Sequence, residues 1–203
     1  MPAVEALLPR FRSANTQVLG VSVDSVYSHA NWARDLGGVS FPLLSDFEPK
    51  GAVGRAYGAY LEKPGIDDRA TVLVDSTGIV RHASSVTPAG QRNIADLAAL
   101  CEEMDRTSTG PKEPFSPPPG PPAGAALYIK SRCGFSRATL LAMDNLHLTG
   151  TLPVRNVTDD EAARADLLRI AGKETAPCLV TGDQALHESK DIIGRLVAAV
   201  APL

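Results

Sequence analysis

Short apolar segments alternate with amphipathic segments along this chain of 203 residues. In the first half, two nearly continuous apolar runs, 18–23 and 70–74, predict strands that are buried on both faces. Apolar residues at helical spacing predict helices over 4–11, 25–36, 50–60 and 93–104. Further short strands are predicted over 41–44, after a pair of glycines, and over 79–83. Strands that alternate with helices predict an α/β sheet covered on both faces.

The second half repeats this alternation at a smaller scale. Apolar segments at 126–129, 153–157 and 175–180 predict strands, and Gly182–Asp183 predicts the turn of a hairpin. Periodic segments predict helices over 137–146, 159–170 and 188–197, where Thr158 and Glu161 have the spacing of a capping box for the middle one. The order βαβαββα is that of a compact thioredoxin-like domain.

Proline is concentrated between these two halves. Seven of the 16 prolines lie between Pro111 and Pro122, and ten of the residues 107–125 are Pro or Gly. Such a tract lacks backbone donors and favours extended conformation, so it cannot form a packed core. The sequence therefore predicts a domain over 1–106, a linker over 107–124 and a second domain over 125–203.

Composition and charge exclude several classes of protein. The net charge of −3 is interspersed and shows no basic cluster, so no nucleic-acid partner is expected. No apolar run approaches the roughly 20 residues needed to span a bilayer, and the opening residues lack the pattern of a signal peptide. Three cysteines far apart in the sequence do not make a disulfide framework. We expect a cytoplasmic protein, without a membrane partner.

Cys133 has the sequence context of a reactive thiol. It lies where the strand at 126–129 gives way to a helix, and Lys130, Arg132 and Arg137 are within four residues of it. Exposed N–H groups at a helix N-terminus and nearby cations favour the thiolate, which is the nucleophilic form. We therefore predict a lowered pKa for Cys133. The four histidines show no metal-binding spacing, and no metal site is expected.

The first half resembles the peroxiredoxins, in the branch of alkyl hydroperoxide reductases and thiol-specific antioxidants. The residues that carry the resemblance are 18–25, Trp32, 41–46, 56–58 and 69–75. The resemblance implies a thioredoxin fold with a peroxidatic cysteine at the start of a helix, close to an Arg, a Pro and a Thr or Ser. Of these site residues only Arg69 has a position here, as a remnant of the peroxide site.

The resemblance also implies that this first domain is incomplete at its N-terminus. In the family, the peroxidatic cysteine lies well before the Leu-Pro pair that matches Leu8–Pro9. Counting back from Leu8 to the position of that cysteine passes Met1. Two explanations stay open: a start assigned too late, or loss of peroxidase chemistry. Asp67 and Asp68 beside Arg69 also suit a simple surface ion pair. Cys101, in an amphipathic helix, suits a buried structural thiol better than a resolving cysteine.

Residues 125–203 resemble the glutaredoxins. Three segments carry the resemblance, 128–133, 175–177 and 188–192, and the active sequence Cys-Gly-Phe-Ser over 133–136 is that of the monothiol members. It implies Cys133 as the catalytic residue and glutathione as the co-substrate. Lys130 would face the glycyl carboxylate, the backbone of Ala176 before a cis Pro177 would pair with the tripeptide, and Glu188 and Ser189 would bind the γ-glutamyl end. Cys178 suits packing, and a disulfide with Cys133 stays open.

The expected function is that of a glutathione-dependent thiol-disulfide oxidoreductase in antioxidant defence. Its partners would be glutathione and either oxidised protein thiols or a peroxiredoxin, and association into a homo-oligomer is a further expectation. Two alternatives remain. Two chains could share a two-iron two-sulfur cluster through Cys133 and glutathione, although the longer approach loop of typical monothiol members is missing. Alternatively, the chain could be a non-enzymatic redox interaction protein with an association surface near Ser45, Asp46 and Tyr57.

Overall fold

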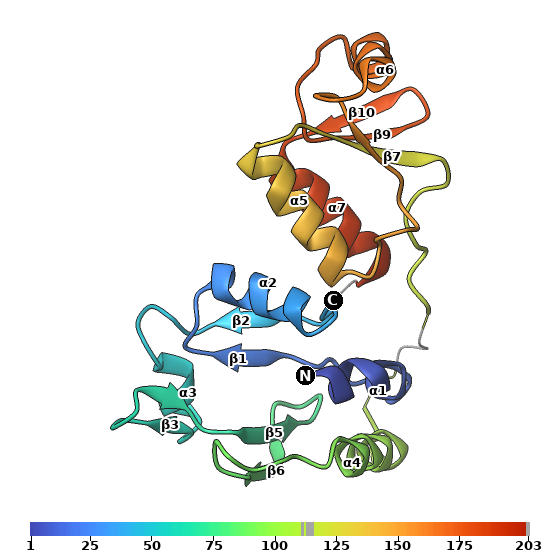
Figure 1. Ribbon diagram of the computed structural model, residues 1–203. Helices are drawn as coiled ribbons and strands as arrows, with labels where there is room; N and C mark the ends of the chain where they lie inside the picture. Colours follow the sequence, from blue (N-terminus) through green and yellow to red (C-terminus); the bar gives the residue numbers. More distant parts are fainter. Residues whose placement is uncertain (111, 113–115, 202–203) are drawn as a thin grey trace. The chain divides into compact units, whose positions relative to one another are not determined.

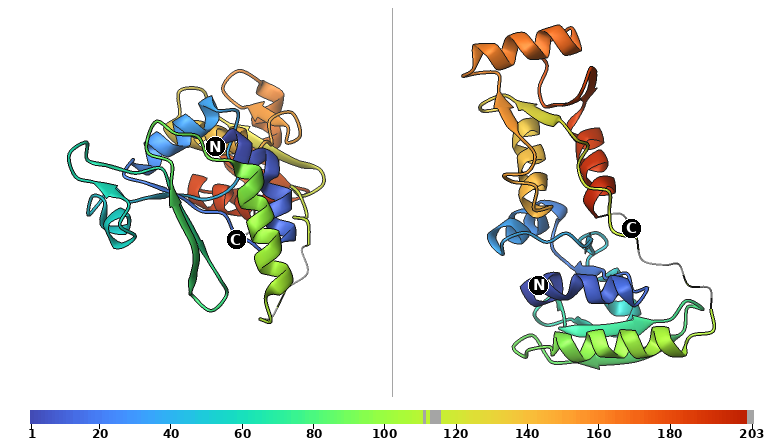
Figure 2. Two further views of the ribbon diagram at one scale, coloured as in Figure 1. Left: turned by 90° about the horizontal axis from the view of Figure 1, so that it is seen from below. Right: turned by 90° about the vertical axis from the view of Figure 1, so that its right-hand side faces the viewer.

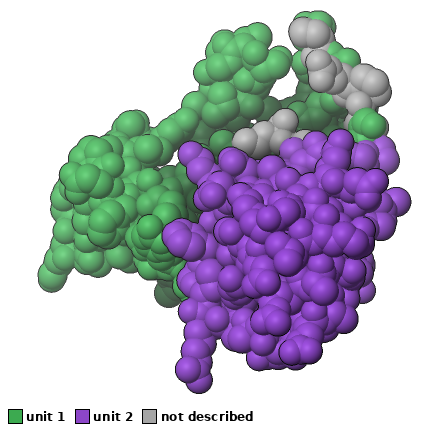
Figure 3. Space-filling model, turned by 90° about the horizontal axis from the view of Figure 1, so that it is seen from above, with its two compact units in different colours: residues 1–32, 41–116 green, residues 33–40, 117–203 purple. Residues whose placement is uncertain are grey.

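The computed structural model describes residues 1–110, 112 and 116–201 of the chain. These divide into two compact units, which Figure 3 distinguishes by colour: Met1–Trp32 with Phe41–Ser116, and Ala33–Ser40 with Pro117–Leu203. The predicted linker over 107–124 contains residue 111 and residues 113–115, which lie outside the described residues. The predicted domain boundaries therefore stay predictions.

Unit 1 is built from short helices and strands that alternate along the chain, as expected. Its helices are α1 (Pro2–Ser13), most of α2 (Val26–Asp35), α3 (Ala52–Ala56) and α4 (Ile94–Thr107). Its strands are β1 (Gly20–Ser22), β2 (Leu43–Ser45), β3 (Tyr60–Leu61), β4 (Ile66–Asp67), β5 (Ala70–Val74) and β6 (Val80–Ser85).

The strands of unit 1 pair two by two. β1 is parallel to β2, whereas β3 with β4 and β5 with β6 are antiparallel hairpins. The prediction that residues 18–23 and 70–74 are buried on both faces is wrong, because Val21 is 41% exposed and Val74 is 46% exposed. Each of these strands has a single hydrogen-bonded neighbour within the described chain, so much of its surface lacks the cover that a wider sheet would supply.

The third helix of unit 1 is much shorter than predicted. α3 ends at Ala56, and Gly58 follows with a φ of 66°. A left-handed residue stops a helix, and Tyr60, predicted to be the last helical residue, instead begins β3. The hairpin of β3 and β4 was not predicted, since each of its strands has only two residues.

The described core of unit 1 lies between α1 and α4, which run side by side in Figure 2. Phe11 and Ala14 of the α1 end pack against Ala98 and Cys101 of α4, all nearly inaccessible to solvent. The side chain of Asn93 caps α4 by accepting a hydrogen bond from the Asp96 N–H. This arrangement makes Cys101 part of a hydrophobic contact.

Unit 2 has the predicted order βαβαββα. It consists of β7 (Ala125–Ile129), α5 (Gly134–Asn145), β8 (Val154–Asn156), α6 (Glu161–Ala171), β9 (Cys178–Thr181), β10 (Gln184–His187) and α7 (Ser189–Val200). The strands form one sheet in the order β10-β9-β7-β8. β8 is parallel to β7, β9 is antiparallel to β7, and β10 is antiparallel to β9.

Helices cover both faces of this sheet (Figure 1). α5 and α7 pack on one face through Met143, Ile192 and Leu196, against Leu127 and Leu179 of the sheet. α6 packs on the other face, where the buried residues are Tyr128, Val157, Ala163, Leu167, Cys178 and Val180. Alternate residues of β7 and β9 thus serve two separate cores, as the period of two in a strand requires.

The capping residue of α6 differs from the prediction. Asp160, not Thr158, is the N-cap, and its carboxylate accepts the N–H of Ala163. Thr158 lies two residues ahead of the cap and uses its hydroxyl elsewhere, as described below. Both residue types favour the cap position, so the pattern alone could not separate them.

None of the helices in the described part of the chain is long and apolar enough to cross a membrane.

Candidate active site

The candidate active site lies at the edge of the unit 2 sheet where β7 leads into α5. After β7, a short turn brings Arg132 into the left-handed region with a φ of 56°, and Cys133 follows in extended conformation as the N-cap of α5. Cys133 is therefore held at the helix N-terminus, where the N–H groups of the first turn lack helical partners. It is the partly exposed one of the three free cysteines.

The pKa of Cys133 is lowered, as the sequence predicts, but mainly by the helix and not by cations. The backbone N–H of Ser136 contributes most, followed by the Ser136 hydroxyl, and the Phe135 N–H contributes less. Lys130 adds a smaller effect through its charge, while Arg132 and Arg137 are not among the main causes. The neutral thiol makes no geometrically complete cap hydrogen bond, so these groups favour the thiolate in particular.

Ser136 has a second contact that ties the site together. Its hydroxyl oxygen accepts the backbone N–H of Lys130 at 3.1 Å, and the residue is 2% exposed. Ser136 therefore connects the end of β7 to the first turn of α5, with Cys133 in between. Sequence reasoning identified it as the replacement of a resolving cysteine and missed this role.

Ala176 and Pro177, which immediately precede β9, lie opposite Cys133. The Ala176–Pro177 peptide bond is cis, as predicted from the resemblance, and the carbonyl oxygen of Ala176 lies 3.9 Å from the Cys133 Sγ. Pro177 itself is buried. The structure thus brings Cys133, Ala176 and Pro177 together at one point of the sheet edge.

A polar cluster holds the turn that precedes Cys133. The N–H of Ser131 donates to the Thr158 hydroxyl at 3.0 Å, and the Ser131 hydroxyl donates to Asp159 at 3.0 Å. The amide of Asn156 donates to both Ser131 and Asp159, at 2.8 and 2.5 Å. These contacts join β8 and the segment before α6 to the turn. The sequence gives no signal for them, since the partners are far apart along the chain.

The other residues predicted to bind glutathione lie on elements that meet at the same edge. Lys130 is exposed in the turn after β7. Glu188 is the N-cap of α7 with a φ of 67°, makes no side-chain cap hydrogen bond, and is followed by Ser189 as the first helical residue. β10 ends immediately before Glu188, and its last residue, His187, pairs with Cys178, the residue after Pro177. The start of α7 therefore lies beside the cis-proline step.

Cys178 and Cys101 have the opposite character to Cys133. Cys178 is fully buried on the α6 face of the sheet, and burial raises its pKa to about 11. Burial also raises the pKa of Cys101. Both thiols are free, so the disulfide between Cys133 and Cys178 that the sequence left open is not formed in this structure. Two packing thiols and one accessible nucleophile remain.

Arg69 lies in unit 1 and is exposed. One of its guanidinium nitrogens donates to the Gly90 carbonyl at 3.1 Å. A second arginine, Arg92, lies close enough for the charge of Arg69 to lower its pKa, together with burial. Arg92 donates to the Ala70 carbonyl, next to Arg69 in sequence. The predicted ion pair with Asp67 or Asp68 is not among the described salt bridges, and Arg92 was missed by sequence reasoning.

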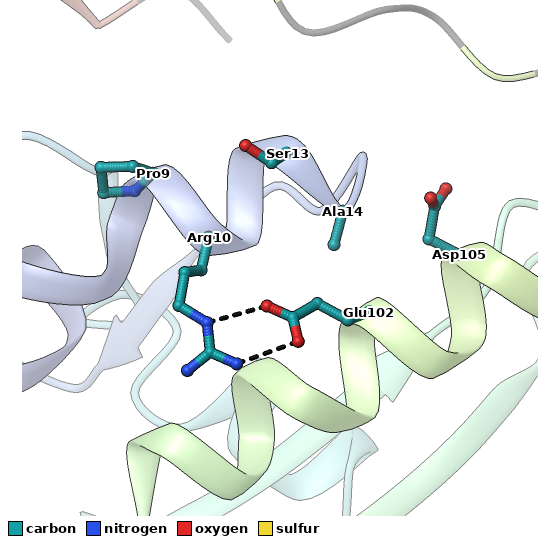
Figure 4. A pocket seen from close by; sticks show the side chains of 6 residues that line it. All are labelled: Pro9, Arg10, Ser13, Ala14, Glu102 and Asp105. Carbon is teal, nitrogen blue, oxygen red and sulfur yellow. Dashed lines mark hydrogen bonds and ion pairs between the residues drawn. The ribbon is translucent and has the colours of Figure 1, made fainter.

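A surface pocket of about 280 Å³ lies between α1 and α4 (Figure 4). Its polar groups are already engaged, since Arg10 donates to both oxygens of Glu102 at 2.8 and 2.9 Å. Asp105 accepts a hydrogen bond from Asn15. No cysteine lines this pocket, and its one hydroxyl side chain, Ser13, has no histidine beside it among the lining residues, so the candidate site stays with Cys133.

Among the described residues, no group of three or more His, Cys, Asp or Glu side chains is placed to hold a metal ion. A two-iron two-sulfur cluster takes four thiolates, and this edge of the sheet presents only Cys133. The described residues of one chain therefore do not make a ligand set for a cluster.

Two families of known proteins match separate parts of this chain. Residues 1–83 match the AhpC/TSA family, and residues 125–186 match glutaredoxin. Alkyl hydroperoxide reductase E of Mycobacterium tuberculosis is 43% identical over 86 residues, which cover 42% of this chain and 56% of the relative. Alkyl hydroperoxide reductase C of Buchnera aphidicola is 36% identical over 102 residues, covering 47% and 50%. The chain thus spans about half the length of these curated relatives.

Among solved structures, Mycobacterium tuberculosis AhpC is similar with a TM-score of 0.47 and 28% identity, over 51% of this chain and 62% of that chain. Both matched families are oxidoreductases, and their match to the two halves confirms the expected α/β fold class with two thioredoxin-like regions. The chain therefore joins a region that matches the AhpC/TSA family to a region that matches glutaredoxin.

Proposed function

We propose that this chain is a glutathione-dependent thiol-disulfide oxidoreductase of antioxidant defence, and that Cys133 works by monothiol exchange. The observation that carries the proposal is the setting of Cys133. Its pKa is lowered at the start of α5, and its sulfur lies against the Ala176 carbonyl at the cis-proline step. A thiolate at an exposed helix N-terminus is a good nucleophile and a good leaving group in thiol exchange.

The exchange consists of two balanced steps. In the first step, the Cys133 thiolate attacks the glutathione sulfur of a mixed disulfide, the Cys133–glutathione bond forms, and the substrate thiolate leaves. In the second step, the thiolate of a free glutathione attacks the sulfur bound to Cys133, oxidised glutathione leaves, and the Cys133 thiolate is restored. Ser136 has no sulfur with which to resolve the intermediate, so the second glutathione is required.

The glutathione moiety would lie along the edge of the sheet next to Cys133. The backbone of Ala176 offers hydrogen bonds to an extended peptide, in the manner of an added strand. Lys130 offers a cation for the glycyl carboxylate. The start of α7 at Glu188 and Ser189 offers N–H groups without a side-chain cap for the γ-glutamyl carboxylate.

Reduction of a glutathionylated peptide by glutathione tests this proposal. The full chain should turn over the peptide, and Cys133→Ser should reduce the rate to that of the uncatalysed reaction. Cys101→Ser is the matched control, because this thiol is buried, has a raised pKa and lies in the other unit. Full activity of the Cys133→Ser variant would show that the nucleophile lies elsewhere.

The first unit suggests the natural partner of this activity. That partner would be the oxidised thiol of a peroxiredoxin, which the glutaredoxin region would reduce. The Arg69–Arg92 pair would be what unit 1 keeps of a peroxide site. Association with further copies of the chain, or with another peroxiredoxin, would bring such a thiol to Cys133. Three free thiols suit a reducing compartment such as the cytoplasm.

A further inference from the structure

One row of polar residues crosses the sheet directly behind the candidate site. His187 of β10 pairs with Cys178 of β9, Cys178 pairs with Tyr128 of β7, and Tyr128 pairs with Arg155 of β8. Cross-strand partners share one face of a sheet, and Tyr128 and Cys178 belong to the core on the α6 face. The proposed chemistry of Cys133 uses none of these four residues.

The row is packed against the walls of the proposed glutathione site. Cys178 follows the cis-proline, whose preceding residue faces Cys133. His187 precedes Glu188, the N-cap of α7. A contact between His187 and Cys178 therefore joins the segment that would pair with the glutathione backbone to the segment that would hold its γ-glutamyl end.

His187 touches the cis-proline segment on both sides. Its Nε2 lies 3.9 Å from the Cys178 Sγ, and its ring also interacts with the backbone of Thr175, ahead of Ala176. Burial lowers the pKa of His187, and Lys173 lowers it further, so the ring is neutral at pH 7. Its Nδ1 is buried and makes no geometrically complete hydrogen bond within the described chain. The ring is thus fixed in place by these neighbours.

The side chain of Cys178 has little room to move if His187 shifts. It is fully buried, and on its other side Tyr128 is 3% exposed. The Tyr128 hydroxyl accepts a hydrogen bond from Arg155 at 3.1 Å, and Arg155 also binds Asp166 of α6 at 2.5 Å. The position of the cis-proline segment therefore depends on a row that is anchored at its far end.

We propose that His187, acting with Cys178, is a positioning residue that fixes the cis-proline segment relative to the start of α7 and so sets the affinity for the glutathione moiety. This inference rests on the proposed function. It separates two properties of the site: the reactivity of Cys133, which comes from α5, and the recognition of glutathione, which comes from the spacing of its two walls.

The test compares two mixed disulfides of the same peptide, one with glutathione and one with cysteamine, in the full chain. His187→Leu should raise KM for the glutathionylated peptide about two- to tenfold, the range of one lost hydrogen bond. Its kcat/KM for the cysteamine disulfide and the pH midpoint of Cys133 alkylation should stay unchanged. His187→Gln, which keeps an amide near the position of Nε2, should restore part of the affinity.

Val180→Ala is the matched control. Val180 lies on the same face of β9, one row farther from the site, so its truncation should lower stability without changing KM. If His187→Leu does not fold, Cys178→Val provides the same comparison. In a double-mutant cycle, the effects of Cys178→Val and His187→Gln on KM should be non-additive.

The outcomes separate this inference from the function on which it rests. A wild-type chain that does not turn over the glutathionylated peptide would overturn the proposed function. A wild-type chain that does so, with KM unchanged in His187→Leu or raised equally in Val180→Ala, would overturn the inference alone.

Discussion

The three cysteines of this chain show how the surroundings of one residue type decide its chemistry. Cys133 faces the N–H groups at the start of a helix, and these favour the charged thiolate. Cys101 and Cys178 lie among apolar side chains, where charge is disfavoured. The candidate nucleophile can therefore be picked out by its position at a strand-helix junction, and the packing thiols by the apolar spacing around them.

Ser136→Ala should raise the pKa of Cys133 and slow its alkylation at pH 7 by about three- to tenfold, because hydrogen bonds to a charged group are among the strongest. The variant keeps the backbone N–H of residue 136, so the loss is partial. Iodoacetamide alkylation measured across pH gives both the rate and the midpoint. Arg137→Gln removes a nearby cation that is not among the main causes of the shift, so it should change both values much less. An effect of Arg137→Gln as large as that of Ser136→Ala would contradict this account.

Asp67 provides a second test at the residue scale, in unit 1. Both of its carboxylate oxygens are buried and find no hydrogen-bond partner among the described residues, and burial together with Asp46 and Asp24 raises its pKa. The folded state therefore loses stability as pH rises from the ordinary Asp value through the raised one. Asp67→Asn should raise the midpoint of urea unfolding at pH 7 and have little effect near pH 3.

Asp68→Asn is the control for that measurement. Asp68 accepts hydrogen bonds from the Ser85 hydroxyl and the Arg69 N–H, so its neutralisation should lower the same midpoint. A stabilising Asp68→Asn, or a destabilising Asp67→Asn at pH 7, would show that burial of the Asp67 carboxylate is not the dominant effect.

At the scale of elements, the sequence predicts what depends on local periodicity. The helices α2, α4, α5 and α7 and the order of unit 2 follow from apolar spacing, and the junction at Cys133 follows with them. The short α3 and the hairpin of β3 and β4 do not, since a stretch of helical spacing there is interrupted at Gly58. The cluster around Ser131 was equally unpredictable, because its members meet only after β7 and β8 have paired.

The segment before α6 separates a structural residue from a functional one. Asp160 caps the helix, whereas the Thr158 hydroxyl accepts the Ser131 N–H beside Cys133. Asp160→Ala should lower the stability of unit 2 by about 1 kcal/mol, the usual value of a lost cap, with little change in kcat/KM for the glutathionylated peptide. Thr158→Ala should lower kcat/KM for the glutathionylated peptide and leave the thermal midpoint nearly unchanged. The reverse pattern would restore Thr158 as the cap.

At the scale of the whole molecule, the chain combines two regions that match two families of oxidoreductases. A tether of Pro and Gly raises the effective concentration of one region near the other when its reach allows. The combination is useful only if unit 1, or a protein that associates with it, presents an oxidised thiol to Cys133. The cysteine content of unit 1 makes this requirement testable.

We expect the chain to reduce a glutathionylated peptide efficiently and to consume hydrogen peroxide slowly in the presence of glutathione. The single cysteine of unit 1, Cys101, is 3% exposed and has a raised pKa, so it cannot attack peroxide as a thiolate at neutral pH. Peroxide consumption followed with and without an added peroxiredoxin checks this, and the added protein should raise the rate in a manner that depends on Cys133. Rapid consumption by the chain alone that is lost in Cys101→Ser would make Cys101 the peroxidatic residue. In that case, the packing of α1 against α4 would have to open during turnover, because it is this contact that now covers the thiol.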